Sequence, residues 1–141
     1  MDLFHELLAA FGLIVLAICI HGTGVTLMDK LFRSEVEKHH RQALAKREIK
    51  VMIPMALCLF ALHTLEITMF ALFYLFAGDI HTFGEALYRS ALAYTTMGVT
   101  DGEINKWPMV AAFEGLAGFL LIGWSAAVFV TDMDKVLRKR G

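Results

Sequence analysis

Three long apolar stretches constrain the fold of this 141-residue chain more than any other feature. They are Leu7–Met28, Val51–Gly78 and Trp107–Thr131. A helix needs about 20 apolar residues to cross a hydrocarbon core of roughly 30 Å, and each stretch reaches that length. The first stretch contains no Asp, Glu, Lys or Arg, and each of the other two contains a single acid, Glu66 or Glu114. We therefore expect an all-α membrane protein with three transmembrane helices.

The composition agrees with this expectation, because 57% of the residues are hydrophobic and only 19% are charged. A soluble domain of this size would carry more polar surface. The first stretch does not read as a signal peptide, since no basic segment precedes it and its apolar run is too long. Cys19 and Cys58 both fall inside predicted spans, where a thiol acts as a small hydrophobe, and we expect no disulfide.

The placement of basic residues predicts the orientation of the chain. Of the 13 Lys and Arg residues, seven lie in Lys30–Lys50 and four in Lys135–Arg140. Cytoplasmic segments of membrane proteins carry an excess of Lys and Arg. We therefore expect the 30–50 connection and the C-terminus to lie in the cytoplasm. The N-terminus and the 78–107 connection then lie outside the cell membrane.

The outer connection contains a short amphipathic segment that ends in a polar run. Asp79 or Thr82 can cap a short helix that has Glu85 in its first turn. The segment 81–101 reads HTFGEALYRSALAYTTMGVTD. It resembles the pore helix and selectivity filter of the potassium-channel superfamily, in which Thr-Thr-x-Gly-aromatic-Gly-Asp follows the helix. The resemblance covers Val51–Val130.

The resemblance implies a domain organisation around a re-entrant pore loop. We expect an N-terminal transmembrane helix (1–28), a cytoplasmic helical connection (29–50), a pore module (51–132) and a basic cytoplasmic tail (133–141). Within the module we expect an outer helix (51–78), a pore helix (82–95), a filter loop (95–101) and an inner helix (107–132). One loop per chain offers too few oxygens to replace the hydration shell of an ion, so we expect a homotetramer around a central pore.

The resemblance also assigns roles to the filter, which comprises Thr95, Thr96, Met97, Gly98, Val99, Thr100 and Asp101. Thr96 would supply a hydroxyl and a carbonyl at the inner mouth, and Met97 and Gly98 would supply the next carbonyls. Asp101 would anchor the outer end of the loop. Gly98 fits this role because carbonyls that face one axis require a backbone of alternating handedness, which residues with a Cβ resist.

Two filter positions depart from the family pattern. Thr100 stands where the second glycine is usual, and Val99 replaces the usual aromatic residue. A β-branched residue at positive φ costs about 1–2 kcal/mol in each subunit. We therefore expect an intact inner half and a rearranged outer half of the filter, with relaxed potassium selectivity.

Other positions in the predicted module carry candidate roles. Gly118 and Gly123 are candidates for a gating hinge in the inner helix, with close packing of small residues as the alternative. Asp79 and Glu103 would concentrate cations at the outer mouth, with solvated loop charge as the alternative. Glu114 is expected behind the filter, where it would tie the inner helix to the pore helix.

Ionisable residues inside membrane spans are functional suspects. His63 and Glu66 lie three residues apart and can face the same way. They form either a metal or proton site, or a structural pair that packs the second span against the pore module. His21 is the other intramembrane histidine. Counted from the expected span ends, His21 and His63 lie at heights several ångströms apart, which disfavours both as axial ligands of one haem.

The sequence therefore predicts a homotetrameric channel that passes monovalent cations, most readily potassium, passively through the filter. The expected partners are identical subunits, membrane lipid and the permeating ions, with no nucleic acid, metal or other cofactor. The alternatives are a non-selective monovalent cation channel, a non-conducting channel-like subunit or sensor, and a haem-binding membrane redox protein. We expect no enzyme activity, because the sequence has no nucleophile-base pair, phosphate-cradling loop or nucleotide motif.

Overall fold

The structure is a computed structural model, and it describes residues 2–38, 44–78, 80–98 and 106–138. It confirms the all-α class. The helices, in chain order, are α1 (Leu3–Lys38), α2 (Leu44–Phe76), α3 (Phe83–Tyr94) and α4 (Pro108–Arg138). Three segments are long and apolar enough to cross a membrane, namely Leu3–Phe32, Ile49–Phe76 and Pro108–Asp134. The chain is thus a multi-pass membrane protein by the length and composition of its helices.

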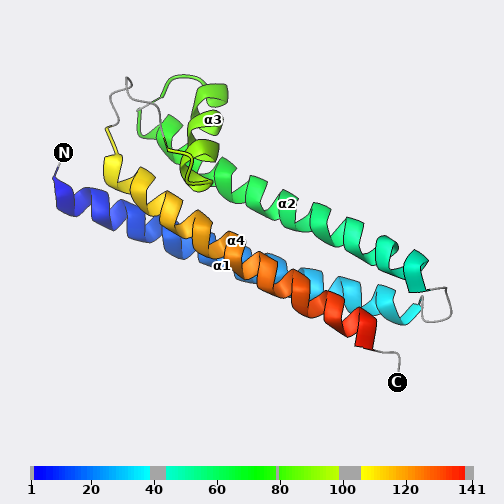
Figure 1. The fold of residues 1–141 in the computed structure, drawn as a ribbon. Helices are drawn as coiled ribbons and strands as arrows, with labels where there is room; N and C mark the ends of the chain where they lie inside the picture. The colour runs from blue at the N-terminus through cyan, green and yellow to red at the C-terminus, as the bar shows by residue number, and fades with distance from the viewer. Residues whose placement is uncertain (1, 39–43, 79, 99–105, 139–141) are drawn as a thin grey trace.

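The three long helices form an elongated bundle, with α3 packed at one end (Figure 1). Helices α1 and α4 lie side by side and run in the same direction, and α2 runs in the opposite direction. Helix α3 contacts α2 and α4. It lies at the end of the bundle where α2 ends and where α1 and α4 begin.

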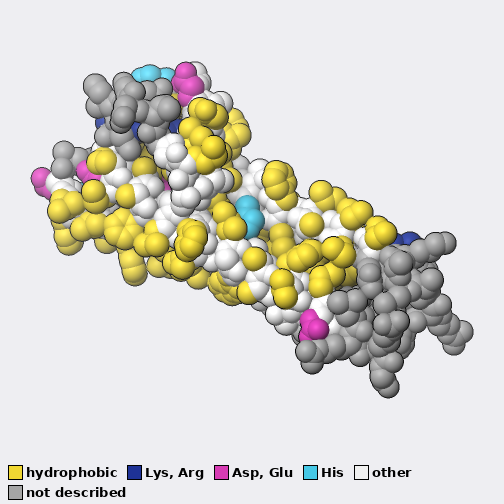
Figure 2. Space-filling model, viewed as in Figure 1, with side chains coloured by type: hydrophobic (Ala, Val, Ile, Leu, Met, Phe, Trp, Pro, Cys, Tyr) yellow, Lys and Arg dark blue, Asp and Glu magenta, His cyan; other side chains and the backbone are white. Residues whose placement is uncertain are grey.

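The flanks of the bundle are apolar. Figure 2 shows hydrophobic side chains along the visible face, with the charged ones near its two ends. Every long helix exposes phenylalanines, among them Phe11, Phe60 and Phe119, which are 66%, 73% and 67% exposed. An apolar surface of this extent requires lipid or partner protein around it.

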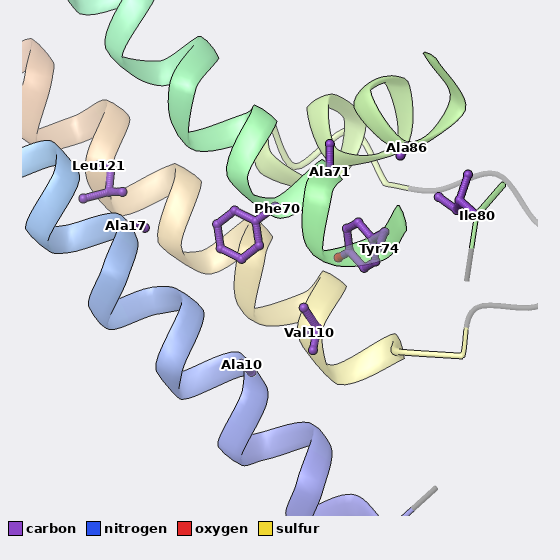
Figure 3. Close-up of a cluster of buried hydrophobic side chains, with 9 residues drawn as sticks. All are labelled: Ala10, Ala17, Phe70, Ala71, Tyr74, Ile80, Ala86, Val110 and Leu121. Atoms are coloured by element: carbon purple, nitrogen blue, oxygen red, sulfur yellow. The ribbon is translucent and has the colours of Figure 1, made fainter. Parts of the chain in front are cut away.

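The main hydrophobic core lies at the α3 end of the bundle (Figure 3). Its large members are Phe70 and Tyr74 of α2, and its other members are Ala10, Ala17, Ala71, Ile80, Ala86, Val110 and Leu121. Alanines on α1 and α3 let these helices approach the others closely. A smaller core of Met28, Met55 and Leu59 packs the opposite half of the bundle.

Side chains from other segments fix the ends of the helices around α3. Thr82 caps α3, because its hydroxyl oxygen accepts the Glu85 N–H at 3.4 Å and its hydroxyl donates to the Glu85 carboxylate at 2.8 Å. Glu6 of α1 accepts the Met109 N–H in the first turn of α4 at 3.2 Å. Lys106 donates to the Gly78 carbonyl at 2.7 Å, which ties together the two ends of the outer connection.

The spans continue as helix beyond the bounds expected from hydropathy. Helix α1 reaches Lys38 and α2 begins at Leu44, so that much of the expected 29–50 connection prolongs the two spans. Several residues with expected roles lie outside the described part of the chain, namely Asp79, Val99, Thr100, Asp101 and Glu103.

Candidate functional site

The chain makes a strained turn directly after α3. Thr95 caps the helix, and Thr96 and Gly98 follow with φ of 60° and 80°. Among the described non-glycine residues, Thr96 alone has positive φ, so Met97 between the two does not. Positive φ in a residue with a Cβ costs about 1–2 kcal/mol. Strain of this kind persists only where the surrounding structure imposes it.

This turn packs against α4 inside the bundle. The Tyr94 carbonyl at the end of α3 packs on Gly118 so closely that a Cβ there would collide with it. Gly118 lies ten residues after Pro108, the first residue of α4. At 1.5 Å per residue this is about 15 Å along the helix, roughly a third of its length.

The turn is exposed on one side of the bundle. Thr95, Thr96, Met97 and Gly98 are all exposed, and Met97 retains 77% of its accessible surface. Beside them lies an open hollow of about 480 Å³, lined by Ala93, Thr96, Gly98, Ala111, Ala112, Gly115, Leu116 and Phe119. Irregular backbone at membrane depth is tolerated only where protein covers it or water reaches it.

Behind the turn, all four helices contribute to one buried polar cluster. His21 comes from α1, His63 and Glu66 from α2, Tyr94 from α3 and Ser125 from α4. We call these five residues the junction cluster. His21 and Glu66 are fully buried. The four helices therefore meet around a carboxylate in the interior of the bundle.

The carboxylate of Glu66 lies between the two imidazoles. Its Oε1 is 2.8 Å from His21 Nδ1, and its Oε2 is 3.2 Å from His63 Nδ1. The Tyr94 hydroxyl donates to Oε2 and lies 2.9 Å from His63 Nδ1. On the far side, Ser125 Oγ lies 3.0 Å from His63 Nε2 and 3.4 Å from His21 Nε2.

The partners of the two imidazoles define the donors at Glu66. A carboxylate accepts hydrogen bonds, so Nδ1 of His21 and Nδ1 of His63 donate to it. Ser125 can donate its one hydroxyl proton to only one of the two Nε2 atoms. The buried carboxylate therefore has a hydrogen-bond donor at each of its two oxygens, which its burial requires.

His21 and His63 belong to one cluster, although the sequence placed them at heights several ångströms apart. Their ring centroids are 5.4 Å apart, and Nδ1 of each ring faces Glu66, a contact that the sequence did not predict. The expected height of His21 assumed that the first span ends near Met28, whereas the candidate span extends to Phe32 within a longer helix. The difference in height stays a prediction.

Three members of the junction cluster could hold a metal ion. Ligand atoms of His21, His63 and Glu66 all lie within 4.8 Å of one another. Two imidazoles and one carboxylate are a common donor set for Zn²⁺. This set involves the His63 and Glu66 pair, for which the sequence left both a metal site and a structural role open.

A second buried polar cluster joins α3 to α2 and α4. Glu114 accepts a hydrogen bond from Tyr74 at 2.7 Å and one from Ser90 at 2.5 Å. Ser90 also lies 2.8 Å from the Ile67 carbonyl. Arg89 lies over the Tyr74 ring at 5.7 Å. Glu114 thus fixes α4 to α3 behind the turn.

The two hinge candidates have different surroundings. Gly118 is buried against Tyr94, and the close approach of the two helices accounts for its lack of a side chain. Gly123 has nothing within 4 Å of the position that its Cβ would take. Helix α4 is continuous through both, and a hinge at either remains a prediction.

Sequence reasoning missed the hydroxyl groups of the two buried polar clusters, namely those of Tyr74, Ser90, Tyr94 and Ser125. A signal for two of them was present, because Ser90 and Tyr94 lie four residues apart and share one face of α3. The other two give no such signal, since the register between α2 and α4 decides which residues meet.

Fold and site together define a multi-pass helical membrane protein with a buried polar junction behind a strained turn at the end of α3. No family model, curated protein or solved structure matches the chain.

Proposed function

We propose that four copies of the chain form a cation channel in the cell membrane, with ions passing along the central axis through Thr96–Val99. The observation that carries this proposal is the positive φ of Thr96 and Gly98 at the end of α3. A backbone that alternates in handedness turns successive carbonyls to the same side. A row of carbonyls on one side can replace the hydration shell of a cation.

The position of α3 supports the proposal. In this role α3 is the pore helix, and its C-terminal end points toward the middle of the membrane. The last carbonyls of a helix carry partial negative charge. Four such ends directed at one axis favour a cation in the cavity below the filter. Phe119 and Leu120 of α4, both exposed, then shape that cavity.

The exposed turn supports a tetramer. One chain provides one carbonyl at each level of the filter, and four chains provide the set that a dehydrated ion needs. The open hollow beside Thr96 and Gly98 is where a neighbouring subunit would cover this backbone. In the proposed orientation the N-terminus is outside, the basic tail is cytoplasmic and the filter opens outward.

Potassium is the proposed principal ion. The inner filter Thr96-Met97-Gly98 keeps the pattern of potassium filters, whereas Val99 and Thr100 depart from it. Fewer coordination levels weaken the discrimination between potassium and sodium. The same departure favours the second candidate function, which is a channel-like subunit or sensor that does not conduct.

Ion flux into liposomes that contain the purified chain tests the proposal. We expect uptake of potassium and rubidium, weaker uptake of sodium, and a higher potassium-to-sodium ratio for Thr100→Gly. Gly98→Ala should abolish uptake, because φ of +80° strains any residue with a Cβ. Gly84→Ala is the matched control: nothing lies within 4 Å of its Cβ position, and its uptake should equal that of the unmodified chain. Absence of flux for all three ions would contradict the proposal in favour of the non-conducting subunit.

A further inference from the structure

We propose that His21, His63 and Glu66 form a binding site for a divalent transition-metal ion, with Zn²⁺ as the best fit. Imidazole nitrogen and carboxylate oxygen are the ligands that Zn²⁺ takes alongside thiolate. Mg²⁺ and Ca²⁺ take oxygen ligands, whereas two of the three ligand groups here are imidazoles. This site concerns the junction cluster alone and does not depend on whether the chain conducts ions.

The distances fit a tetrahedral ion. With bonds of 2.0–2.1 Å, ligand atoms around tetrahedral Zn²⁺ lie about 3.4 Å apart. The two oxygens of Glu66 lie 2.8 Å from His21 Nδ1 and 3.2 Å from His63 Nδ1. All three ligands lie within 4.8 Å of one another. An ion can therefore take the place of the protons between these atoms with small side-chain shifts.

The surroundings hold the ligands in place. The Nε2 atom of each imidazole faces Ser125, so the second nitrogen of each ring has a partner that orients the ring. The buried Tyr94 hydroxyl donates to Glu66 Oε2. Partners of this kind orient metal ligands and tune their affinity. The side chain of His63 is 17% exposed, which gives an ion access from the surface.

A bound zinc ion would link α1 and α2 through metal–ligand bonds, in addition to the packing of the apolar cores. His21 comes from α1, and the other two ligands come from α2. Tyr94 and Ser125 extend the connection to α3 and α4. A bound ion would therefore fix the four-helix junction directly behind the turn at Thr95–Gly98.

Zinc binding to the purified full chain tests this inference. The chain should carry no histidine tag. It should also carry His39→Ala and His40→Ala, because two histidines adjacent in the sequence can bind zinc themselves. We expect one tightly held Zn²⁺ per chain, and Co²⁺ in its place should show the visible bands of a tetrahedral site. His21→Gln and Glu66→Gln should each weaken binding by more than about 100-fold, whereas Tyr94→Phe should weaken it by about 10- to 100-fold.

Two controls make the outcome decisive. His81→Gln removes an exposed histidine and should leave zinc affinity unchanged. If the buried variants do not fold, X-ray absorption of the zinc-loaded chain that carries only His39→Ala and His40→Ala counts the ligands directly, and two imidazoles in a first shell near about 2.0 Å support the site. Absence of retained zinc, or a first shell without imidazole, would overturn the inference. Neither result bears on ion flux, so failure here is distinct from failure of the proposed channel.

Discussion

Gly118 and Gly123 lie five residues apart in α4, yet a methyl group would meet different surroundings at each. At Gly118 it would collide with the backbone of Tyr94, which cannot move without displacing α3. At Gly123 nothing lies within reach. Sequence alone treated both as hinge candidates, because the difference depends on which residue of α3 approaches α4.

We predict opposite effects on stability for Gly118→Ala and Gly123→Ala. The first should lower the free energy of unfolding by about 1–3 kcal/mol through overpacking. The second should raise it by up to about 1 kcal/mol, because alanine is the better helix former. Unfolding of the purified chain in mixed detergent micelles measures both. Equal effects of the two substitutions would contradict the packing role of Gly118.

His21 shows which properties of a single residue can be predicted from the sequence and which cannot. Its apolar surroundings marked it correctly as an intramembrane polar residue. Its expected height depended on where the first span ends, and hydropathy does not locate the end of a helix that continues into polar sequence. Each misplaced residue shifts the expected height by about 1.5 Å. The contact between His21 and Glu66 was therefore not predictable.

At the scale of elements, polar contacts join α3 to its neighbours in addition to the apolar core. Ser90 and Tyr94 reach the buried acids Glu114 and Glu66, and Thr82 caps the start of the helix. The expected bounds of 82–95 are close to those of α3, and Thr82 was one of the two caps that the sequence offered, with Glu85 as the second half of the start signal. Glu114 was expected to tie α3 to α4, as its contact with Ser90 does. The contact between Tyr94 and Glu66 was not expected, because it depends on how α3 packs on α2.

We predict that Tyr94→Phe loosens α3 more than Tyr88→Phe. The first removes a hydroxyl from the buried Glu66 carboxylate, which should cost about 1–3 kcal/mol of unfolding free energy. Tyr88 is 68% exposed, and its substitution should change stability by less than about 0.5 kcal/mol. Hydrogen exchange of the α3 amides reports the loosening directly. Unchanged exchange in Tyr94→Phe would show that the hydroxyl does not anchor the helix.

At the scale of the whole molecule, one chain leaves the polar turn at Thr95–Gly98 uncovered. The three spans and the helical class were predictable, because each span exceeds the length that a bilayer demands. The assembly that covers the turn was inferred from the filter motif and rests on the geometry of Thr96 and Gly98. The large exposed side chains of α4 beside the turn, such as Leu116 and Phe119, agree with a surface made for contact.

A density map of the full chain reconstituted in a lipid bilayer tests the central claim most directly. The account predicts four copies around one axis, with the C-terminal ends of α3 directed at that axis and Thr96–Gly98 of each copy facing the others. A monomer or a dimer would contradict it. So would four copies in which Thr96–Gly98 faces lipid instead of the symmetry axis.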